Sequence, residues 1–113
     1  MINIAYGNVR IKGLSGKMYN FRAYPLETHF GEFGAVFFIT GRKKRRTGGK
    51  MAHSRIYCGE TPNMSVCPYS DNQSASFRAN YANCICVLPV TEGDTRLDIE
   101  RDIHQNYRLL SRG

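Results

Sequence analysis

The sequence predicts an α+β fold, in which a small and mainly antiparallel sheet of three to four strands is flanked by two or three helices. Three observations support this prediction: short apolar runs that end at proline, a glycine-containing connection between two of these runs, and a C-terminal segment with helical periodicity. The chain has 113 residues, of which 42% are hydrophobic. This length supports one core, so residues 1–113 are predicted to form a single domain.

Four stretches of the chain have the pattern of β-strands. The first alternates polar and apolar side chains and is followed by Pro25, as expected of a half-buried strand. The second is a continuous run of mostly apolar side chains, which is typical of a strand covered on both faces. The predicted strands are residues 17–24, 35–40, 55–58 and 84–88. Residues 41–53 are predicted to be the long tip of a hairpin.

Helices are expected after the third strand and near the C-terminus. Thr61 and Pro62 suit the N-cap and first position of a helix, but Pro68 denies that helix a normal second turn. Residues 69–76 are therefore expected to be irregular or weakly helical. The clearest helix follows Asp94, its candidate N-cap. Its apolar residues recur at i, i+4, i+8 and i+11, as Ile99, Ile103, Tyr107 and Leu110.

The net charge of +7 comes from one short segment. Six of the sixteen Lys and Arg residues lie within nine positions, at Arg42, Lys43, Lys44, Arg45, Arg46 and Lys50. The rest of the chain has ten basic and nine acidic residues, so an electrostatic partner is expected at a single surface. The segment has no aromatic residue for base stacking. It suits the backbone of DNA or RNA, an acidic protein surface, or a charged loop that only keeps the chain soluble.

The four cysteines, Cys58, Cys67, Cys84 and Cys86, include no C-x2-C pair, so their spacing does not match the common structural zinc frameworks. Two interpretations stay open: buried structural thiols, which the sequence favours, and a metal or redox role. The chain has no apolar run of about 20 residues and no signal-like N-terminus. The expectation is a cytoplasmic protein with no membrane partner.

Three sequence blocks occur in a fixed order: Gly34-Ala-Val-Phe37, Tyr57-Cys-Gly59 and the helical segment that contains Glu100. Together they resemble the framework of the GIY-YIG nuclease superfamily, with the first block in the place of "GIY" and the second in the place of "YIG". The resemblance is closest to short bacterial proteins in which an aromatic strand and a Tyr-Pro-Leu segment, here Tyr24-Pro-Leu26, precede the first block. It covers the chain from about Lys17 onward and implies a small antiparallel sheet flanked by helices.

The resemblance also implies where a nuclease site would lie. In the family, two tyrosines, an arginine, a neighbouring His or Tyr and a helix-borne glutamate build the site, and the glutamate binds one Mg²⁺-type ion. Tyr57 takes the place of the second tyrosine, and Glu100 that of the metal-binding glutamate. Phe37 replaces the first tyrosine, and Cys67 falls at the arginine position. The position of the neighbouring histidine falls near Asp71.

Two of these replacements argue against catalysis. Phe37 has no hydroxyl and Cys67 has no guanidinium, and the loss of one transition-state contact typically costs about 10²–10³ in rate. The sequence therefore predicts a catalytically degenerate domain that binds nucleic-acid backbone through its basic hairpin tip, with Tyr57 and Glu100 as a remnant site and no cofactor. Both residues also have ordinary structural interpretations. Tyr57 would be an aromatic core residue, and Glu100 would be a carboxylate paired with Arg96 or His104 at i±4.

Two alternative functions stay open. One is a protein-binding inhibitor or accessory factor that reuses the scaffold and derives from a phage or mobile element. The other is a divergent Mg²⁺-dependent endonuclease, in which Glu100 would bind the ion and Tyr57 would assist the chemistry. The sequence leaves the oligomeric state open.

Overall fold

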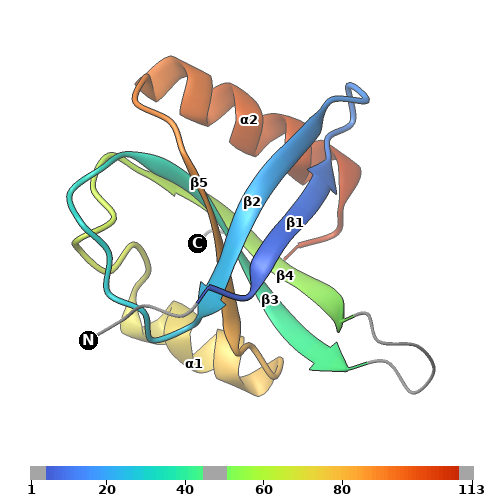
Figure 1. Ribbon diagram of the computed structural model, residues 1–113, viewed down its shortest axis with the longest axis vertical. Coiled ribbons are helices and arrows are strands. Elements are labelled where there is room, and N and C mark those ends of the chain that lie inside the picture. Colours follow the sequence, from blue (N-terminus) through green and yellow to red (C-terminus); the bar gives the residue numbers. More distant parts are fainter. Residues whose placement is uncertain (1–4, 45–50, 110–113) are drawn as a thin grey trace.

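The computed structural model describes residues 5–44 and 51–109 of the chain. In this part of the chain it contains one five-stranded antiparallel sheet and two helices (Figure 1). The strands are β1 (Gly7–Lys12), β2 (Met18–Pro25), β3 (Ala35–Lys44), β4 (Met51–Thr61) and β5 (Cys84–Pro89), and the helices are α1 (Asp71–Ala79) and α2 (Gly93–Asn106). The strands lie in the order β1-β2-β5-β3-β4, and each neighbouring pair is antiparallel. The α+β class is confirmed, whereas the predicted number of strands is too low.

Strand β1 is the element that the sequence prediction omitted. It forms a hairpin with β2, in which Val9 is opposite Phe21 and Ile11 is opposite Tyr19. Ile11 is fully buried, while its neighbours Arg10 and Lys12 are exposed. This alternation is the usual pattern of a half-buried strand, so the segment carried a local signal for β-structure.

The β3–β4 hairpin is longer than predicted. Residues 41–44 and 51–53, which were expected in the hairpin tip, are paired in the ladder, where Arg42 is opposite His53 and Lys44 is opposite Met51. Antiparallel pairing uses backbone groups, so a run of charged side chains continues a strand wherever those side chains reach water. Only residues 45–50 of the predicted tip lie outside the described residues.

The helix expected at Thr61 is not present, because β4 continues to that residue. The Thr61 hydroxyl accepts a hydrogen bond from the amide of Asn63 at 3.2 Å, which forms a turn rather than a helix cap. Helix α1 begins ten residues later, within the segment that was expected to be irregular or weakly helical. Its start is a capping box, in which the Ser70 hydroxyl accepts from the Gln73 amide at 3.1 Å and the Gln73 side chain accepts from the Ser70 amide at 2.9 Å.

The C-terminal helix is confirmed with small changes at its ends. Its N-cap is Glu92, and Asp94 lies in the first turn, where a carboxylate interacts favourably with the helix dipole. Tyr107, which was expected in the last turns, is the C-cap residue. Leu110 lies outside the described residues.

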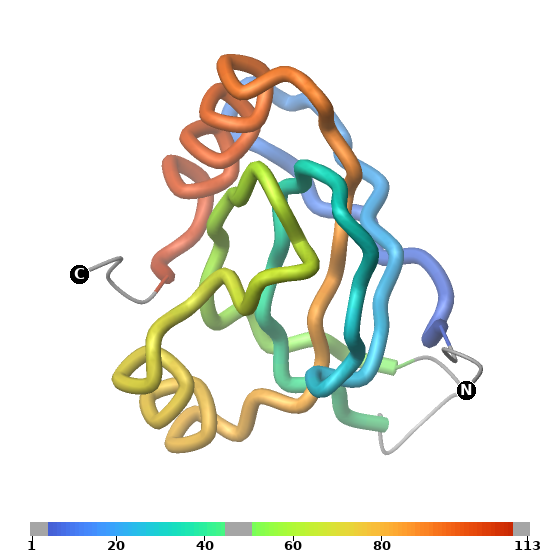
Figure 2. Tube along the Cα trace, turned by 90° about the vertical axis from the view of Figure 1, so that its left-hand side faces the viewer, coloured from blue at the N-terminus to red at the C-terminus, as the bar shows by residue number. Residues whose placement is uncertain are grey.

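The two helices cover opposite faces of the sheet and lie toward opposite ends of the molecule (Figures 1 and 2). Ile103 of α2 joins one core cluster, and Phe77 of α1 joins the other. The α2 cluster contains Ile11, Phe21, Ala23, Val36, Phe38, Cys58, Cys84, Cys86 and Ile103. The α1 cluster contains Ala35, Phe37, Ile39, Ile56, Tyr57, Met64, Phe77, Ile85 and Val87. Alternate residues of β3 therefore supply both cores.

Three of the four cysteines are buried, as the interpretation of structural thiols predicts. Cys58, Cys84 and Cys86 are fully buried in the α2 cluster, and none of these three residues forms a disulfide. Cys67 differs, because it is exposed in the loop that precedes α1.

Gly59 is required by the packing of a neighbouring aromatic ring. It is opposite Phe37 in the β3–β4 ladder, and a Cβ atom at this position would lie 2.6 Å from Phe37 Cζ and 3.1 Å from Tyr57 Cε2. Carbon atoms do not approach that closely without a shift of the ring or of the backbone. The glycine therefore allows the Phe37 ring to lie against β4.

We expect Gly59→Ala to lower the free energy of unfolding by about 1–3 kcal/mol, because the added methyl overpacks the core. Gly31→Ala is the matched control, since a Cβ there meets nothing within 4 Å. Urea denaturation of both variants and of the wild type measures the effect. Equal destabilisation by the two substitutions would contradict the assigned packing.

Asp102 connects α2 to the β1–β2 turn. Its carboxylate accepts hydrogen bonds from the Ser15 amide at 2.8 Å, from the Ser15 hydroxyl at 2.6 Å and from the Tyr19 hydroxyl at 2.6 Å. The bonds from Ser15 and Tyr19 lower the pKa of Asp102 below its ordinary value of 3.8. Burial, together with the bond to Asp102, raises the pKa of Tyr19 to about 12. The contact is therefore made by an ionised carboxylate and a neutral phenol at neutral pH.

Asp102→Asn is expected to destabilise the fold at neutral pH, and the difference from wild type is expected to shrink in acid. The pKa of Asp102 is lower in the folded state, so its contribution is present above 3.8 and is lost as the pH falls through the folded pKa. Denaturation at a series of pH values measures this. The control is Asp98→Asn, whose side chain on the same helix is 75% exposed. If the free energies of unfolding of wild type and Asp102→Asn differed by the same amount at all pH values, the charge of Asp102 would not be involved.

Candidate functional site

The two residues that the resemblance assigns to a remnant site lie on neighbouring elements. Tyr57 is on β4 and 6% exposed, and Glu100 is on α2 and 4% exposed. The Tyr57 ring packs against His104, with centroids 6.5 Å apart, and His104 follows Glu100 by one helical turn. The face of α2 that carries Glu100 is therefore the face that contacts β4. The Tyr57 hydroxyl also accepts a hydrogen bond from Gln73 Nε2 at 3.2 Å.

Arg96 and His104, the helix residues suggested as partners of Glu100, also contact other parts of the fold. Arg96 donates from Nε to Glu60 at 2.8 Å, and from Nη1 to the carbonyl oxygens of Val90 and Thr91 at 3.1 and 2.7 Å. It thereby connects β4 to the loop between β5 and α2. His104 Nε2 lies 2.8 Å from the carbonyl oxygen of Cys58. A carbonyl oxygen only accepts, so this nitrogen carries the hydrogen.

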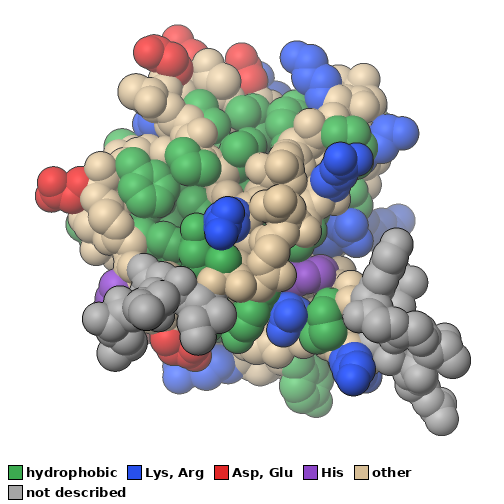
Figure 3. All heavy atoms as spheres, in the orientation of Figure 1, with side chains coloured by type: hydrophobic (Ala, Val, Ile, Leu, Met, Phe, Trp, Pro, Cys, Tyr) green, Lys and Arg blue, Asp and Glu red, His purple; other side chains and the backbone are tan. Residues whose placement is uncertain are grey.

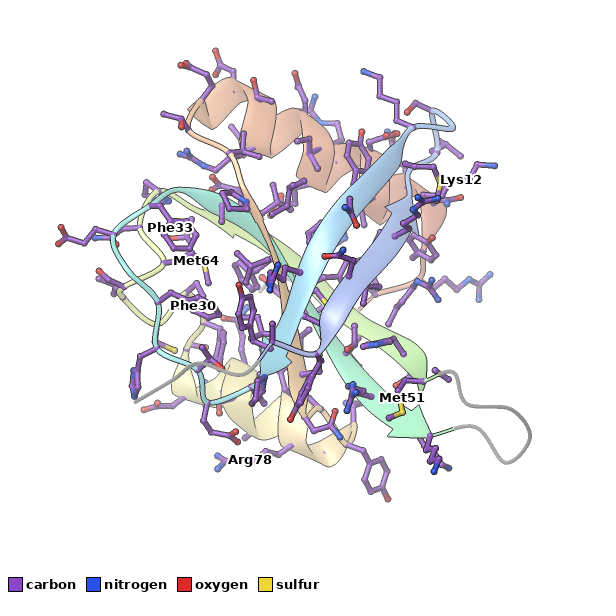
Figure 4. The ribbon with its side chains drawn as sticks, in the orientation of Figure 1. Lys12, Phe30, Phe33, Met51, Met64 and Arg78 are labelled. Atoms are coloured by element: carbon purple, nitrogen blue, oxygen red, sulfur yellow. The ribbon has the colours of Figure 1, made fainter. Side chains whose placement is uncertain are left out.

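The positions that depart from the family pattern do not supply the missing groups. Phe37 is buried, with its ring centroid 6.0 Å from that of Tyr57. Cys67 donates from Sγ to the carbonyl of Tyr69 at 3.4 Å and lines a pocket of about 160 Å³. Asp71 is the exposed first residue of α1. Figure 4 shows Phe30 and Met64, which line the same pocket, on the loops that face one another there.

The described part of the basic segment continues the hairpin beyond the buried sheet. Lys43 and Lys44 are exposed, and the Arg42 guanidinium stacks on the Tyr6 ring at 3.9 Å from its centroid. Arg45, Arg46 and Lys50 lie outside the described residues. In Figure 3, most of the visible Lys and Arg side chains lie on the side of the molecule that carries β1 and this hairpin. Several Asp and Glu side chains lie on the other side.

A groove of about 610 Å³ separates the hairpin from the turn between α1 and β5. Asn83 connects its two walls, accepting from the Arg42 amide at 2.6 Å and donating to the Arg42 carbonyl at 3.0 Å. The groove is lined by Gly41, Arg42, Lys43, Ala52, Ser54, Asn80, Tyr81 and Asn83. Tyr81 is 86% exposed and has a φ of 62°, a conformation that costs a non-glycine residue roughly 1–2 kcal/mol. An exposed aromatic ring therefore lies beside the basic hairpin.

Sequence reasoning missed Tyr81. It assigned no stacking residue to the basic segment, because the segment itself contains none. Tyr81 is brought beside the hairpin by the pairing of β3 with β5, in which Thr40 is opposite Cys84, and by the hydrogen bonds between Asn83 and Arg42. The sequence around Tyr81 indicated only a turn, through the polar turn residues Asn80 and Asn83 on either side of it.

A second group of reactive side chains lies on the other face of the same hairpin. The ligand atoms of His53, Cys84 and Cys86 all lie within 4.8 Å of one another. The Thr40 hydroxyl lies 2.9 Å from His53 Nδ1. Burial, with Arg42 and Arg55 nearby, lowers the pKa of His53 below 6.5. This ring is therefore neutral at pH 7.

The two thiols influence one another. Hydrogen bonding between them stabilises the thiolate of Cys84 and lowers its pKa to about 7, while the same bond and burial raise the pKa of Cys86. The Thr40 hydroxyl, which lies 2.9 Å from His53 Nδ1, also acts to lower the pKa of both thiols. The cluster borders a second groove of about 460 Å³, where residues of β4 face Tyr6 and Asn8. The two edge strands of the sheet thus approach one another at this groove.

Comparison of the chain with protein-family models, with curated proteins and with solved structures finds no match. Neither of the two helices in the described part of the chain is long and apolar enough to cross a membrane.

Proposed function

We propose that this chain is a catalytically degenerate GIY-YIG-like domain that binds the backbone of a nucleic acid through Arg42, Lys43, Lys44, Arg45, Arg46 and Lys50. The observation that carries the proposal is the groove between the hairpin and the α1–β5 turn, which combines Lys43 with the exposed ring of Tyr81. Cations and an unpaired aromatic surface are the two features by which proteins bind single strands without reading sequence.

The relation to the nuclease scaffold is supported by how the sequence blocks lie. The blocks Gly34-Ala-Val-Phe37 and Tyr57-Cys-Gly59 contain paired strand residues, with Phe37 opposite Gly59. The helix that carries Glu100 packs against the second of these strands. Both Tyr57 and Glu100 are almost fully buried, so a phosphate in solution does not reach them without a rearrangement. This burial, with the missing hydroxyl at Phe37, favours binding without cleavage.

The binding mode follows from charge and exposure. Each cation that contacts a phosphate releases a counterion, so binding is expected to weaken steeply with salt. On a single strand, each contact adds about 0.7 to the slope with which the logarithm of the binding constant falls against the logarithm of the salt concentration. A base stacked on an aromatic ring contributes about 1–3 kcal/mol, largely independent of salt. Double-stranded nucleic acid keeps its bases stacked internally. A preference for single strands is therefore expected from Tyr81.

We expect the Lys43→Ala/Lys44→Ala variant to bind a fluorescent single-stranded oligonucleotide more weakly and to lower the salt slope by about 1.4. Anisotropy titrations at several salt concentrations measure both quantities. The matched control is Lys12→Ala/Lys17→Ala, which removes the same charge. Lys12 lies at the end of the β1–β2 hairpin that points away from the β3–β4 hairpin (Figure 4). Tyr81→Ala should lower single-strand affinity by about 5- to 150-fold with the salt slope unchanged.

Two results would contradict this proposal. One is the absence of binding at about 10 µM protein in low salt, since non-specific sites are normally occupied near that concentration. The other is an equal loss of affinity in the control variant. Either result would favour the accessory or inhibitory function, in which the same basic hairpin contacts an acidic protein surface.

An endonuclease remains the second candidate, favoured by the contact between the Glu100-bearing face of α2 and β4. We expect the wild type to nick supercoiled plasmid no faster than Glu100→Ala in the presence of Mg²⁺, because both remnant residues are buried. Glu32→Ala, at an exposed loop position, is the control for charge removal. Metal-dependent nicking by the wild type and by Glu32→Ala, lost in Glu100→Ala, would establish the nuclease and overturn the prediction.

A further inference from the structure

We propose that His53, Cys84 and Cys86 bind a single Zn²⁺ ion. The two cysteines are separated by one residue on β5, so they point to the same face of the sheet. His53 is on β4, and β3 lies between these two strands. Both thiols are fully buried, and the histidine is half-buried at the surface of the groove that contains Tyr6.

The distances suit one ion. Three atoms within 4.8 Å of one another have a common point no more than about 2.8 Å from each of them. Zinc binds sulfur at about 2.3 Å and imidazole nitrogen at about 2.0–2.1 Å. Shifts of about 0.5–0.8 Å per ligand therefore close the site, which small side-chain rotations of His53, Cys84 and Cys86 supply.

The donor set determines the kind of ion. Two thiolates and one imidazole favour a borderline or soft ion and disfavour Mg²⁺ or Ca²⁺, which take oxygen ligands. Two thiolates also neutralise the double charge of Zn²⁺, so the neighbouring Arg42 and Arg55 are not placed beside an excess positive charge. A Cys₂His set leaves the fourth tetrahedral position to water or another small ligand.

The groove provides a path to the site. It is about 460 Å³ in volume, and His53 is one of its lining residues together with Tyr6, Asn8, Val9, Met51, Ala52 and Arg55. The ion would reach the thiols past the imidazole from this side. Bound there, it would cross-link the edge strand β4 to the central strand β5 and so stabilise the base of the basic hairpin.

Thr40 is a positioning residue in this site. It is fully buried on β3, opposite Cys84, and its hydroxyl lies 2.9 Å from His53 Nδ1. When Nε2 holds the ion, a hydroxyl that hydrogen-bonds Nδ1 fixes the orientation of the ring, and the loss of such a partner typically lowers metal affinity about 10- to 100-fold. Thr40→Val keeps the shape of the side chain and removes this bond.

The first experiment titrates chelator-treated protein with Zn²⁺ against a chromophoric competitor and records the absorption of the Co²⁺ form. We expect one ion per chain, a thiolate-to-cobalt charge-transfer band and the intense visible bands of tetrahedral Co²⁺. Cys84→Ser, Cys86→Ser and His53→Gln should each weaken binding by about 100-fold or more, and Thr40→Val by about 10- to 100-fold. Cys58→Ser, a buried thiol outside the cluster, and Cys67→Ser, an exposed thiol, should bind as the wild type does.

The second measurement is thermal unfolding with and without Zn²⁺. A ligand that binds only the folded state raises Tm with its concentration, so the wild type should be stabilised and His53→Gln should not. His53 is half-buried, so this substitution is compatible with folding where a change at a buried cysteine is not. Absence of Zn²⁺ binding by folded wild type, or binding that is unchanged in His53→Gln, would overturn the proposal and leave the cluster as a closed hydrogen-bond network.

Discussion

The rest of the structure depends on the burial of β3 on both faces and its pairing along both edges. Its neighbours are β4 on one side and β5 on the other, and all of its residues from Ala35 to Gly41 are buried. Burying both faces of one strand requires a layer on each face, and α1 and α2 supply these layers. Gly59 allows the ring of Phe37, at the centre of this arrangement, to lie against β4.

The same strand brings the candidate sites to one end of the molecule. Beyond Gly41 it leaves the core while its backbone stays paired with β4, which carries Lys43 and Lys44 into solvent on an ordered ladder. One face of this extension adjoins the groove with Tyr81, and the other adjoins the cluster of His53, Cys84 and Cys86. A metal ion at the cluster would thus stabilise the strands that support the proposed nucleic-acid surface, without contacting the nucleic acid itself.

The two possible metal chemistries in this chain are distinct. Glu100 offers carboxylate oxygen, which suits Mg²⁺, whereas His53, Cys84 and Cys86 offer nitrogen and sulfur, which suit Zn²⁺. Glu100 is on α2, and the other three residues are on β4 and β5. Phe37 is buried and its ring centroid lies 6.0 Å from that of Tyr57, so this position serves the packing of the core.

The elements with local signals were recognisable from the amino-acid sequence. The apolar runs of β3 and β5 and the helical period of α2 were recognised because burial imposes a residue pattern within a few turns or pairs. The Thr61 signal failed because a threonine hydroxyl serves a turn as well as a helix cap. The Ser70–Gln73 capping box lay in a segment that was expected to be irregular or weakly helical. The basic residues of the hairpin were also recognisable from the sequence, but which residues lie beside them depends on the tertiary structure. Tyr81 and Lys43 line one groove, and the ligand atoms of His53 and Cys84 lie within 4.8 Å of each other, because of the register of three neighbouring strands. Register depends on packing between segments that are distant in the sequence.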